Sequence, residues 1–342
     1  MRFGRGVQET TVVILPLTNR HLFFMRIVFI LMLGLTAIAG YGQTTRIEEA
    51  SKLYAGRKLV EASAILRKVS EGDKDYPAAQ YWLGRIAFDE RRYDDAAELF
   101  EEAVDEDPTV ADHHNWLGNA YGTIAQNANV IKQGMLAPKM KSAWERAIAL
   151  DHQNVSARIS LIQFYTQAPG LMGGSFEKAY QMADQIQRID IPQGHLQRGN
   201  ILLAEKKPLE AEREFLEMVK ADPAYQGNLV NFYIGQKKYD KAFALMDELQ
   251  KKNPDDFRIV YLIGRTSAVS GLQLDRGEAM LKKYLTYSPK PNEPSIAGAN
   301  MRLGQIAEKK GNKPEARKYY ESALKLDGTL KEATEGLQRT SK

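Results

Sequence analysis

The chain has 342 residues, of which 44% are hydrophobic and 26% are charged. This is the composition of a folded globular protein, but the length exceeds what one ordinary core fills and is typical of a solenoid, whose core grows by stacking. The chain has no cysteine, which excludes disulfides, thiolate metal sites, a cysteine nucleophile and the lipid-bearing cysteine of a bacterial lipoprotein.

The formal charge of +4 comes mostly from the first residues of the chain. Residues 1–42 contain four arginines and a single glutamate, and without them 43 basic and 42 acidic residues remain. This near-neutral balance indicates neither nucleic acid nor an anionic membrane as a partner.

An apolar run, Ile27–Ala39, follows Met25 and Arg26 and resembles a secretory signal. It is shorter than the roughly 20 residues that a membrane-spanning helix needs. We predict that residues 1–42 comprise a signal peptide starting at Met25 and an unstructured upstream segment, with cleavage after residue 39 or 42. The mature protein is then periplasmic or secreted, with no stable membrane insertion. Retention of the run as an uncleaved anchor is the alternative.

Residues 79–108 predict two amphipathic helices joined by a polar turn. Small and large apolar residues recur at helical spacing on one face of each helix, at Leu83, Gly84, Ala87, Ala96, Leu99, Phe100 and Ala103. Asp94 or Asp95 can cap the second helix, and Pro108 ends the segment. The small residues predict sites where the two helices approach closely.

This pattern resembles the tetratricopeptide repeat, a 34-residue helical hairpin. Its small position 8, alanine position 20, large position 24, alanine position 27 and proline position 32 correspond to Gly84, Ala96, Phe100, Ala103 and Pro108. The spacing between positions 8 and 20 recurs at Ala50 and Ala62, at Gly199 and Ala211, and at Gly304 and Ala316. The resemblance implies an all-α, right-handed superhelical solenoid over residues 46–339, with about eight hairpins and a C-terminal capping helix.

Two segments depart from the repeat length, and we expect inserted turns at residues 122–141 and 166–175. Turns within hairpins lie on one edge of such a solenoid, so the two insertions should be neighbours. Both contain Gly, Pro, Met and Leu, and the apolar candidates for an edge site are Met135, Leu136, Leu171 and Met172. They either pack on each other as a structural lip or form a partner-binding edge.

The resemblance also implies that the first helix of each hairpin lines a concave groove, with position 9 pointing into it. Polar residues occupy this position throughout: Ser51, Arg85, Asn119, Gln163, Asn200, Asn231, Arg265 and Gln305. Tyr81, Asn115, Arg258 and Tyr261 are expected beside them. Amide side chains both donate and accept hydrogen bonds, which suits a peptide backbone, and arginine suits carboxylates. The alternative is a groove that is merely solvated.

Catalytic and cofactor signals are absent from the pattern. The five histidines do not form the pair of a zinc peptidase, and Gly170–Ser175 lacks the lysine of a phosphate-binding loop. We therefore predict no catalytic residues, no metal and no cofactor. The sequence favours a non-catalytic scaffold that binds a protein or peptide during assembly of an envelope or secreted complex. The alternative is a substrate-recognition or accessory subunit of an enzyme. The oligomeric state is not predicted.

Overall fold

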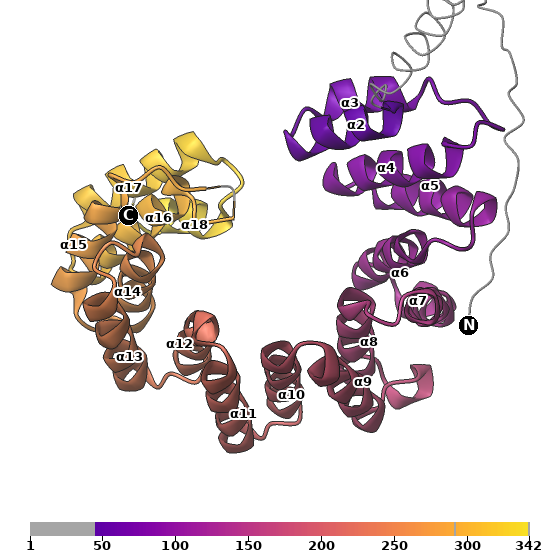
Figure 1. Cartoon of the computed structure of the whole chain (residues 1–342). Coiled ribbons are helices and arrows are strands. Elements are labelled where there is room, and N and C mark those ends of the chain that lie inside the picture. The colour runs from indigo at the N-terminus through magenta and orange to yellow at the C-terminus, as the bar shows by residue number, and fades with distance from the viewer. Residues whose placement is uncertain (1–44, 291, 341–342) are drawn as a thin grey trace, which may run out of the picture. The chain divides into compact units, whose positions relative to one another are not determined.

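The computed structural model describes residues 45–290 and 292–340 of the chain. Across these residues the structure contains 17 α-helices, two short 3₁₀ helices and no strand (Figure 1). The all-α repeat fold expected from the sequence is confirmed. The predicted signal peptide and upstream segment, residues 1–42, lie outside the described residues.

The chain divides into two compact units, and the first ends at Arg92. Its helices are α2 (Arg46–Ala55), α3 (Leu59–Leu66) and α4 (Tyr76–Asp89). α2 and α3 form the first hairpin, with Ala50, Ala62 and Leu66 buried. The division falls inside the repeat at residues 79–108, so α4 belongs to unit 1 and its following helix to unit 2.

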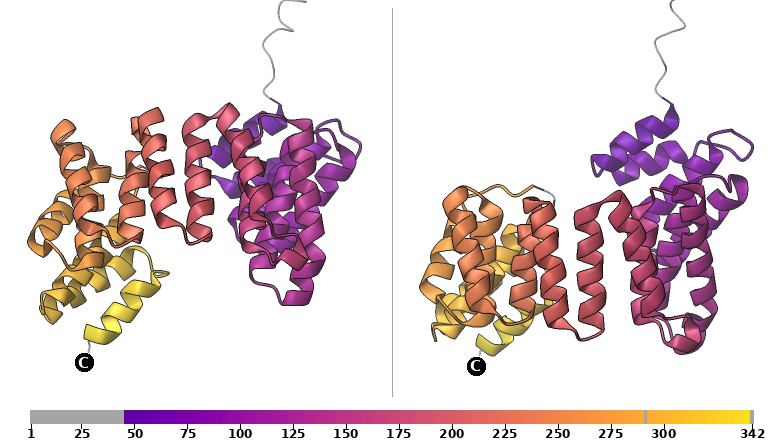
Figure 2. Two further views of the ribbon diagram at one scale, coloured as in Figure 1. Left: turned by 90° about the horizontal axis from the view of Figure 1, so that it is seen from below. Right: turned by 60° about the horizontal axis from the view of Figure 1, so that its bottom comes forward.

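Unit 2 begins at Tyr93 and contains the other helices. They are α5 (Tyr93–Glu106), α6 (Ala111–Gln126), α7 (Val130–Leu150), α8 (Val155–Gln167), η2 (Gly170–Met172), α9 (Phe176–Ile189), α10 (Ile191–Ala204), α11 (Pro208–Ala221), η3 (Pro223–Tyr225), α12 (Gln226–Gly235), α13 (Tyr239–Lys252), α14 (Phe257–Ser270), α15 (Leu274–Tyr284), α16 (Ile296–Lys309), α17 (Lys313–Leu326) and α18 (Lys331–Thr340). From α6 to α17 successive helices pair as antiparallel hairpins stacked side by side (Figures 1 and 2).

Small residues at position 8 let a large side chain of the second helix press against the first. A Cβ atom added at Gly118 of α6 would lie 2.5 Å from Nε1 of Trp144 in α7. At Gly304 of α16 the corresponding distance, to Cε1 of Tyr320 in α17, is 2.6 Å. Neither glycine can become alanine without movement of a buried ring, so the hairpins depend on these close approaches.

The starts of several helices in unit 2 are fixed by polar side chains that accept backbone N–H groups. These N-caps are Asn129, Asn154, Ser175, Asp190, Asp256, Ser295 and Asn312. Asp190 is also the C-cap of α9, so one residue joins α9 to α10. A Cβ atom at Gly194 would lie 2.3 Å from that of Gln187, so the two helices lie in close contact just beyond this link.

The structure corrects the expectation of an inserted turn at residues 122–141. α6 continues to Gln126, residues 127–129 form a short connection, and the insertion lengthens α7 to 21 residues, against 14 in α11. Leu136, Ala137 and Met140 are buried at helical spacing. Pro138 lies inside α7, where its missing N–H interrupts one helical hydrogen bond. The helical period of the buried residues therefore outweighs the turn signals of Gly134 and Pro138.

The second insertion, residues 166–175, is an irregular turn built around η2. Gly173 has φ of 98°, a left-handed conformation that favours glycine, and Ser175 then caps α9. A Cβ atom added at Gly134 of α7 would lie 3.9 Å from Cε of Met172. The structure therefore places the two inserted segments next to each other.

α18 covers the last hairpin of unit 2. Ala333 packs with Tyr320, Met301 and Ala323 in one apolar cluster, and Gly336 lies against the ring of Tyr320, while most other residues of α18 are exposed. A terminal helix with a polar outer face shields the end of a stacked core. Among the described residues, no helix has both the length and the apolar character required to cross a bilayer.

Candidate partner-binding face

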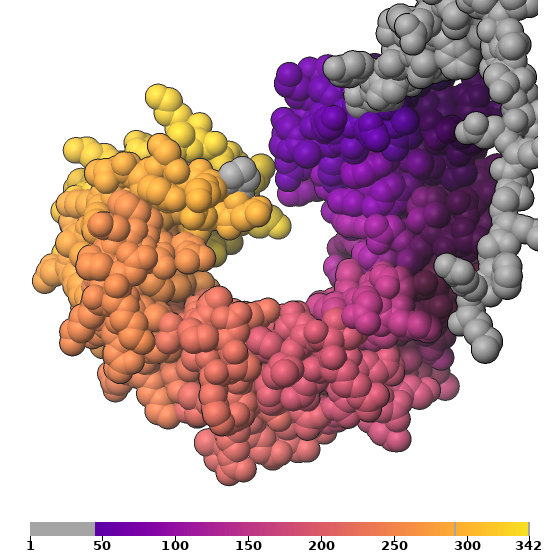
Figure 3. Space-filling model, in the orientation of Figure 1, coloured from indigo at the N-terminus to yellow at the C-terminus, as the bar shows by residue number. Residues whose placement is uncertain are grey.

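The first helices of the hairpins in unit 2 lie on the inner side of its arc. In Figure 1, α6, α8, α10, α12, α14 and α16 face inward and their partners face outward, and Figure 3 shows the inner side as a concave surface. We call this surface the inner face. It carries the position-9 residues Asn119, Gln163, Asn200, Asn231, Arg265 and Gln305, each of which is partly or fully exposed.

At the α6 end of the inner face, amides connect neighbouring helices. Oδ1 of Asn119 accepts hydrogen bonds from Nε1 of Trp144 at 3.0 Å and from Oγ of Ser160 in α8 at 3.1 Å. Asn115, one turn earlier, donates to Oγ of Ser156 at 3.4 Å and is only 3% exposed. Asn115 and Asn119 therefore stabilise the packing of α6, α7 and α8, and Asn115 is not an open groove residue.

Further along, the position-9 residues are more open. Gln163 and Asn200 are exposed, and Nη1 of Arg265 donates to Oδ1 of exposed Asn231 at 3.0 Å. This hydrogen bond places the position-9 residues of α12 and α14 in direct contact, as expected for equivalent positions in adjacent repeats. Donors and acceptors thus lie close together on this stretch of the inner face.

Two residues expected beside this row are placed differently. Tyr261 is 8% exposed, with its ring centroid 5.1 Å from that of Tyr284, so it belongs to the core. Arg258 is exposed, but its guanidinium lies 3.3 Å from the carboxylate of Asp256, which caps α14. That carboxylate raises the pKa of Arg258 by hydrogen bonding.

Unit 1 holds the predicted residues Ser51, Tyr81 and Arg85. Nη1 of Arg85 donates to the hydroxyl of Tyr81 at 2.9 Å, and Nη2 donates to that of Tyr54 at 3.2 Å. Its guanidinium also lies over the rings of Tyr54, Tyr81 and Trp82. Tyr81 is buried and Ser51 and Arg85 are half-buried. Arg85 was expected to bind carboxylates. Its guanidinium is instead engaged by these three aromatic side chains, which disfavours that role.

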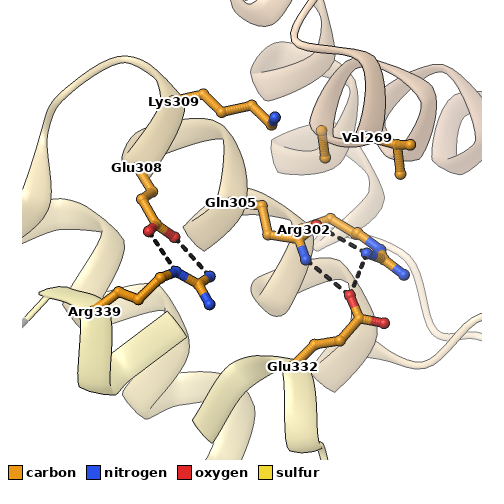
Figure 4. Close-up of a pocket in the computed structure, with 8 residues that line it drawn as sticks. Val269, Arg302, Gln305, Glu308, Lys309, Glu332 and Arg339 are labelled. Carbon is orange, nitrogen blue, oxygen red and sulfur yellow. Dashed lines mark hydrogen bonds and ion pairs between the residues drawn. The ribbon is translucent and has the colours of Figure 1, made fainter. Parts of the chain in front are cut away.

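The C-terminal end of the inner face forms a cleft between α14, α16 and α18 (Figure 4). The cleft has a volume of about 460 Å³ and is lined by Ala268, Val269, Arg302, Gln305, Glu308, Lys309, Glu332 and Arg339. Of these, the sequence pattern predicted only Gln305. Arg302 was detectable, since it lies three residues earlier on the same helical face. Glu332 and Arg339 could not be predicted in this way, because they belong to the capping helix, which lies outside the repeats and has no position 9.

Two sets of polar contacts cross this cleft from α16 to α18. Glu308 accepts from Nε of Arg339 at 2.8 Å and from the hydroxyl of Tyr320 at 2.8 Å. Arg339 beside Glu308 lowers the pKa of that carboxyl, and burial raises the pKa of Tyr320. In the second set, Glu332 accepts from Arg302 at 2.8 Å and from Gln305 at 2.9 Å.

A second cleft, about 400 Å³, lies among α9, α10 and α11. Several of its polar groups are paired: Glu214 accepts from Nε of Arg198 at 3.3 Å and lies 2.7 Å from Nδ1 of His195, while Tyr180 donates to Glu205 at 2.6 Å. This network connects three helices and pairs Arg198 with Glu214.

The candidate edge residues separate into two kinds. Leu136 is 8% exposed and Met172 is half-buried beside Gly134, so both stabilise the contact between the inserted segments. Met135 is 68% exposed and Leu171 is 99% exposed. Only the latter pair remains available to a partner.

Two adjacent histidines of α6 contribute packing and hydrogen bonds. His113 and His114 are buried, and their ring nitrogens lie 3.0 Å from the carbonyl oxygens of Ala103 and Pro108. Burial lowers the pKa of His113. Within the described part of the chain, no group of three or more acidic or histidine side chains is arranged to hold a metal ion.

Two stretches match family models of the tetratricopeptide repeat. They are residues 47–121 and residues 297–330, at opposite ends of the described chain. The chain contains tetratricopeptide repeats. The intervening repeats follow the same packing, with Phe215 against Gly199 and Leu281 against Gly264.

Among the solved structures that align with the chain, yeast Tom70 shows the same fold. Yeast Tom70 aligns with a TM-score of 0.55 at 16% sequence identity, over 88% of this chain and 58% of that one. A tetratricopeptide repeat protein from Parabacteroides merdae aligns with a TM-score of 0.49 at 15% identity, over 87% of this chain and 98% of that one.

Curated proteins with similar sequences include the protein O-mannosyl-transferase TMTC3 of mouse and of human. Both are 24% identical to this chain, over 265 residues in mouse and 275 in human. The matches cover 72% and 75% of this chain but 27% and 28% of the relatives, so the chain spans little more than a quarter of their length.

Proposed function

We propose that this chain is a non-catalytic scaffold that binds an extended segment of a partner protein along the inner face of unit 2. The repeat fold supports this proposal, because stacked hairpins create extended concave surfaces that serve protein binding. The observation that carries it is the row of three exposed amides, Gln163, Asn200 and Asn231, and the half-buried Arg265, in which Arg265 and Asn231 are joined by a hydrogen bond.

The chemistry of this row suits a peptide backbone. An extended peptide has unpaired N–H and C=O groups along its length, and each amide side chain offers a donor and an acceptor. Arg265 adds a cation for acidic side chains. Asn119 is excluded from the proposed site, since its carbonyl oxygen already satisfies Trp144 and Ser160.

The test replaces Gln163, Asn200, Asn231 and Arg265 with alanine and uses the purified protein to capture partners. We expect the variant to lose the partner captured by the unaltered protein while its melting temperature stays nearly the same, because three of these side chains are exposed and Arg265 is only half-buried. A control variant with Arg213, Glu217 and Lys220 of α11 changed to alanine should retain the partner. Unchanged capture by the inner-face variant would refute the site.

We further propose that the protein acts outside the cytoplasm, in the assembly of an envelope or secreted complex. The apolar run that follows Met25 supports this location. N-terminal sequencing of exported protein should begin at Gly40 or Gln43, and a start near Arg2 would contradict it. Partners should then be sought in the periplasmic or extracellular fraction.

A second candidate is an accessory subunit that presents substrate to an enzyme. The similarity to part of two proteins named as O-mannosyl-transferases favours this candidate. The two functions differ in the captured protein: an enzyme partner supports the accessory role, and structural partners support the scaffold. Under both, the purified chain alone should show no mannosyl transfer.

A further inference from the structure

The C-terminal cleft of unit 2 already contains a bound carboxylate from the protein itself. Oε2 of Glu332 in α18 accepts from Nη1 of Arg302 at 2.8 Å and from Nε2 of Gln305 at 2.9 Å. Nη1 of Arg302 also donates to Oε1 of Gln305 at 2.8 Å, which orients the amide. These two donors of α16 thus form a preorganised site for one carboxylate oxygen (Figure 4).

The two partners of this ion pair differ in exposure. The side chain of Arg302 is 15% exposed, whereas that of Glu332 is 55% exposed. Nε of Arg302 is shielded from solvent and has no acceptor within the described residues. A half-exposed carboxylate can rotate into water at little cost, but the largely buried guanidinium then requires another acceptor. The site therefore favours exchange of one carboxylate for another.

The cleft also contains a further cation on α16 and an apolar surface on α14. Lys309, on the same helix as Arg302, makes no ion pair with any described residue, and its stem passes Gly271 at the end of α14. Val269 is 43% exposed beside it. The lining residues comprise three basic and two acidic side chains, so the cleft has an excess of positive charge.

We propose that Glu332 is an internal substitute for an acidic side chain of a partner, which displaces it and binds Arg302, Gln305 and Lys309. The ligand is an extended segment in which Asp or Glu adjoins an apolar residue that contacts Val269. This proposal rests on the proposed function, because it assigns the chemistry of a partner at one end of the inner face. It extends the recognition site into a helix that otherwise serves as a cap.

Displacement requires movement of the Glu332 side chain and not of α18. Ala333 and Gly336 hold this helix against α16 and α17, where the ring of Tyr320 lies against the backbone of Gly336. Arg339 and Glu308 provide a second attachment at 2.8 Å. The capping helix can therefore stay in place while its carboxylate leaves the site.

The test measures binding of a fluorescein-labelled hexapeptide of alternating Leu and Glu, by fluorescence anisotropy at low and moderate salt. A peptide of alternating Leu and Gln is the control. We expect Glu332→Gln to strengthen binding of the acidic peptide by roughly 2- to 5-fold, because the internal competitor loses its charge. Glu335→Gln, a matched change on an exposed residue of the same helix, should leave binding unaltered.

Variants of the basic residues of α16 test the same proposal. Lys309→Gln should weaken binding roughly 2- to 5-fold, and Arg302→Gln more than about 10-fold. Lys318→Gln on α17 is the control. Equal binding of the two peptides, or no gain with Glu332→Gln, overturns the proposal. Displacement by glutarate at the peptide's own dissociation constant also overturns it in favour of a small-carboxylate site.

These outcomes are separable from those of the inner-face variant. If the inner-face variant loses its partner and Glu332→Gln does not change binding of the acidic peptide, the scaffold function stands and the internal-ligand proposal fails. If the peptide responds to Glu332→Gln while the inner-face variant still captures its partner, the cleft binds acidic segments and the remainder of the inner face does not.

Discussion

The hairpins α6–α7 and α16–α17 pack in the same way but use their inner-face amides differently. In each, a glycine of the first helix receives a large ring from the second, Trp144 or Tyr320. The indole N–H of Trp144 is satisfied by Asn119 on the inner face, whereas the hydroxyl of Tyr320 is satisfied by Glu308, which leaves Gln305 to bind Glu332. The hydrogen-bonding needs of the packed ring thus determine whether the amide at position 9 stabilises the fold, as Asn119 does, or can bind a partner, as Gln305 can.

The largest effect is expected from truncating the ring itself. Trp144→Ala removes a 5% exposed indole and should lower the free energy of unfolding by about 3–5 kcal/mol. Trp144→Phe keeps most of the packing and should cost clearly less. Urea denaturation followed by circular dichroism measures both. A loss below about 1 kcal/mol for the alanine variant would show that this hairpin does not depend on the ring.

The next largest effect distinguishes Asn119 from Gln305 by the free energy of unfolding that each contributes. Asn119→Ala leaves the buried indole N–H without its acceptor and should cost about 1–3 kcal/mol. Gln305→Ala breaks only half-exposed contacts and should cost less than about 1 kcal/mol. Equal losses in urea denaturation would remove the distinction drawn between the two hairpins.

A smaller effect is expected in the turns within hairpins. Gly311, before α17, has φ of 80°, while Lys206 has φ of 62° at the equivalent position before α11. Because left-handed backbone favours glycine, Lys206→Gly should stabilise the protein by about 0.5–1 kcal/mol and Gly311→Lys should destabilise it by a similar amount. Thermal melting with both variants tests the pair, and matching signs would contradict the conformational argument.

The smallest change is expected from pH, through a histidine that the last hairpin lacks. Burial lowers the pKa of His113 in the folded protein below its value of about 6.5 in the unfolded chain. The unfolded chain therefore takes up more protons as the pH falls through 6.5, and stability decreases. The urea midpoint should fall as the pH is lowered from 7.5 through 6.5 to about 5.5, and His113→Gln should flatten this dependence. A midpoint that rises toward acid would contradict the assignment.

The sequence predicted the fold because its main signal is local. Pairs such as Gly304 and Ala316 specify a close approach of two helices within one hairpin. The stacking of successive hairpins then reproduces the same contact in each of them. The expectation of an inserted turn at residues 122–141 was wrong, because Leu136 and Met140 continue a helical period into the core despite the proline between them.

The candidate site was less predictable than the fold. Position 9 identified polar residues correctly, but repeat position does not specify what a side chain already contacts. The role of Asn119 depends on a tryptophan 25 residues away, and that of Gln305 on a carboxylate 27 residues away. Tyr81, Asn115 and Tyr261 share the helix faces of exposed residues but are buried against neighbouring helices, which a count along one helix does not register.

The one-residue link at Asp190 has a consequence for cooperativity. Because this residue ends α9 and begins α10, neither helix can unwind at this end without freeing the backbone groups of the other. The hairpins α8–α9 and α10–α11 should therefore open as one block in hydrogen exchange. The longer connection between α15 and α16 imposes no such coupling, so the C-terminal hairpin can exchange separately.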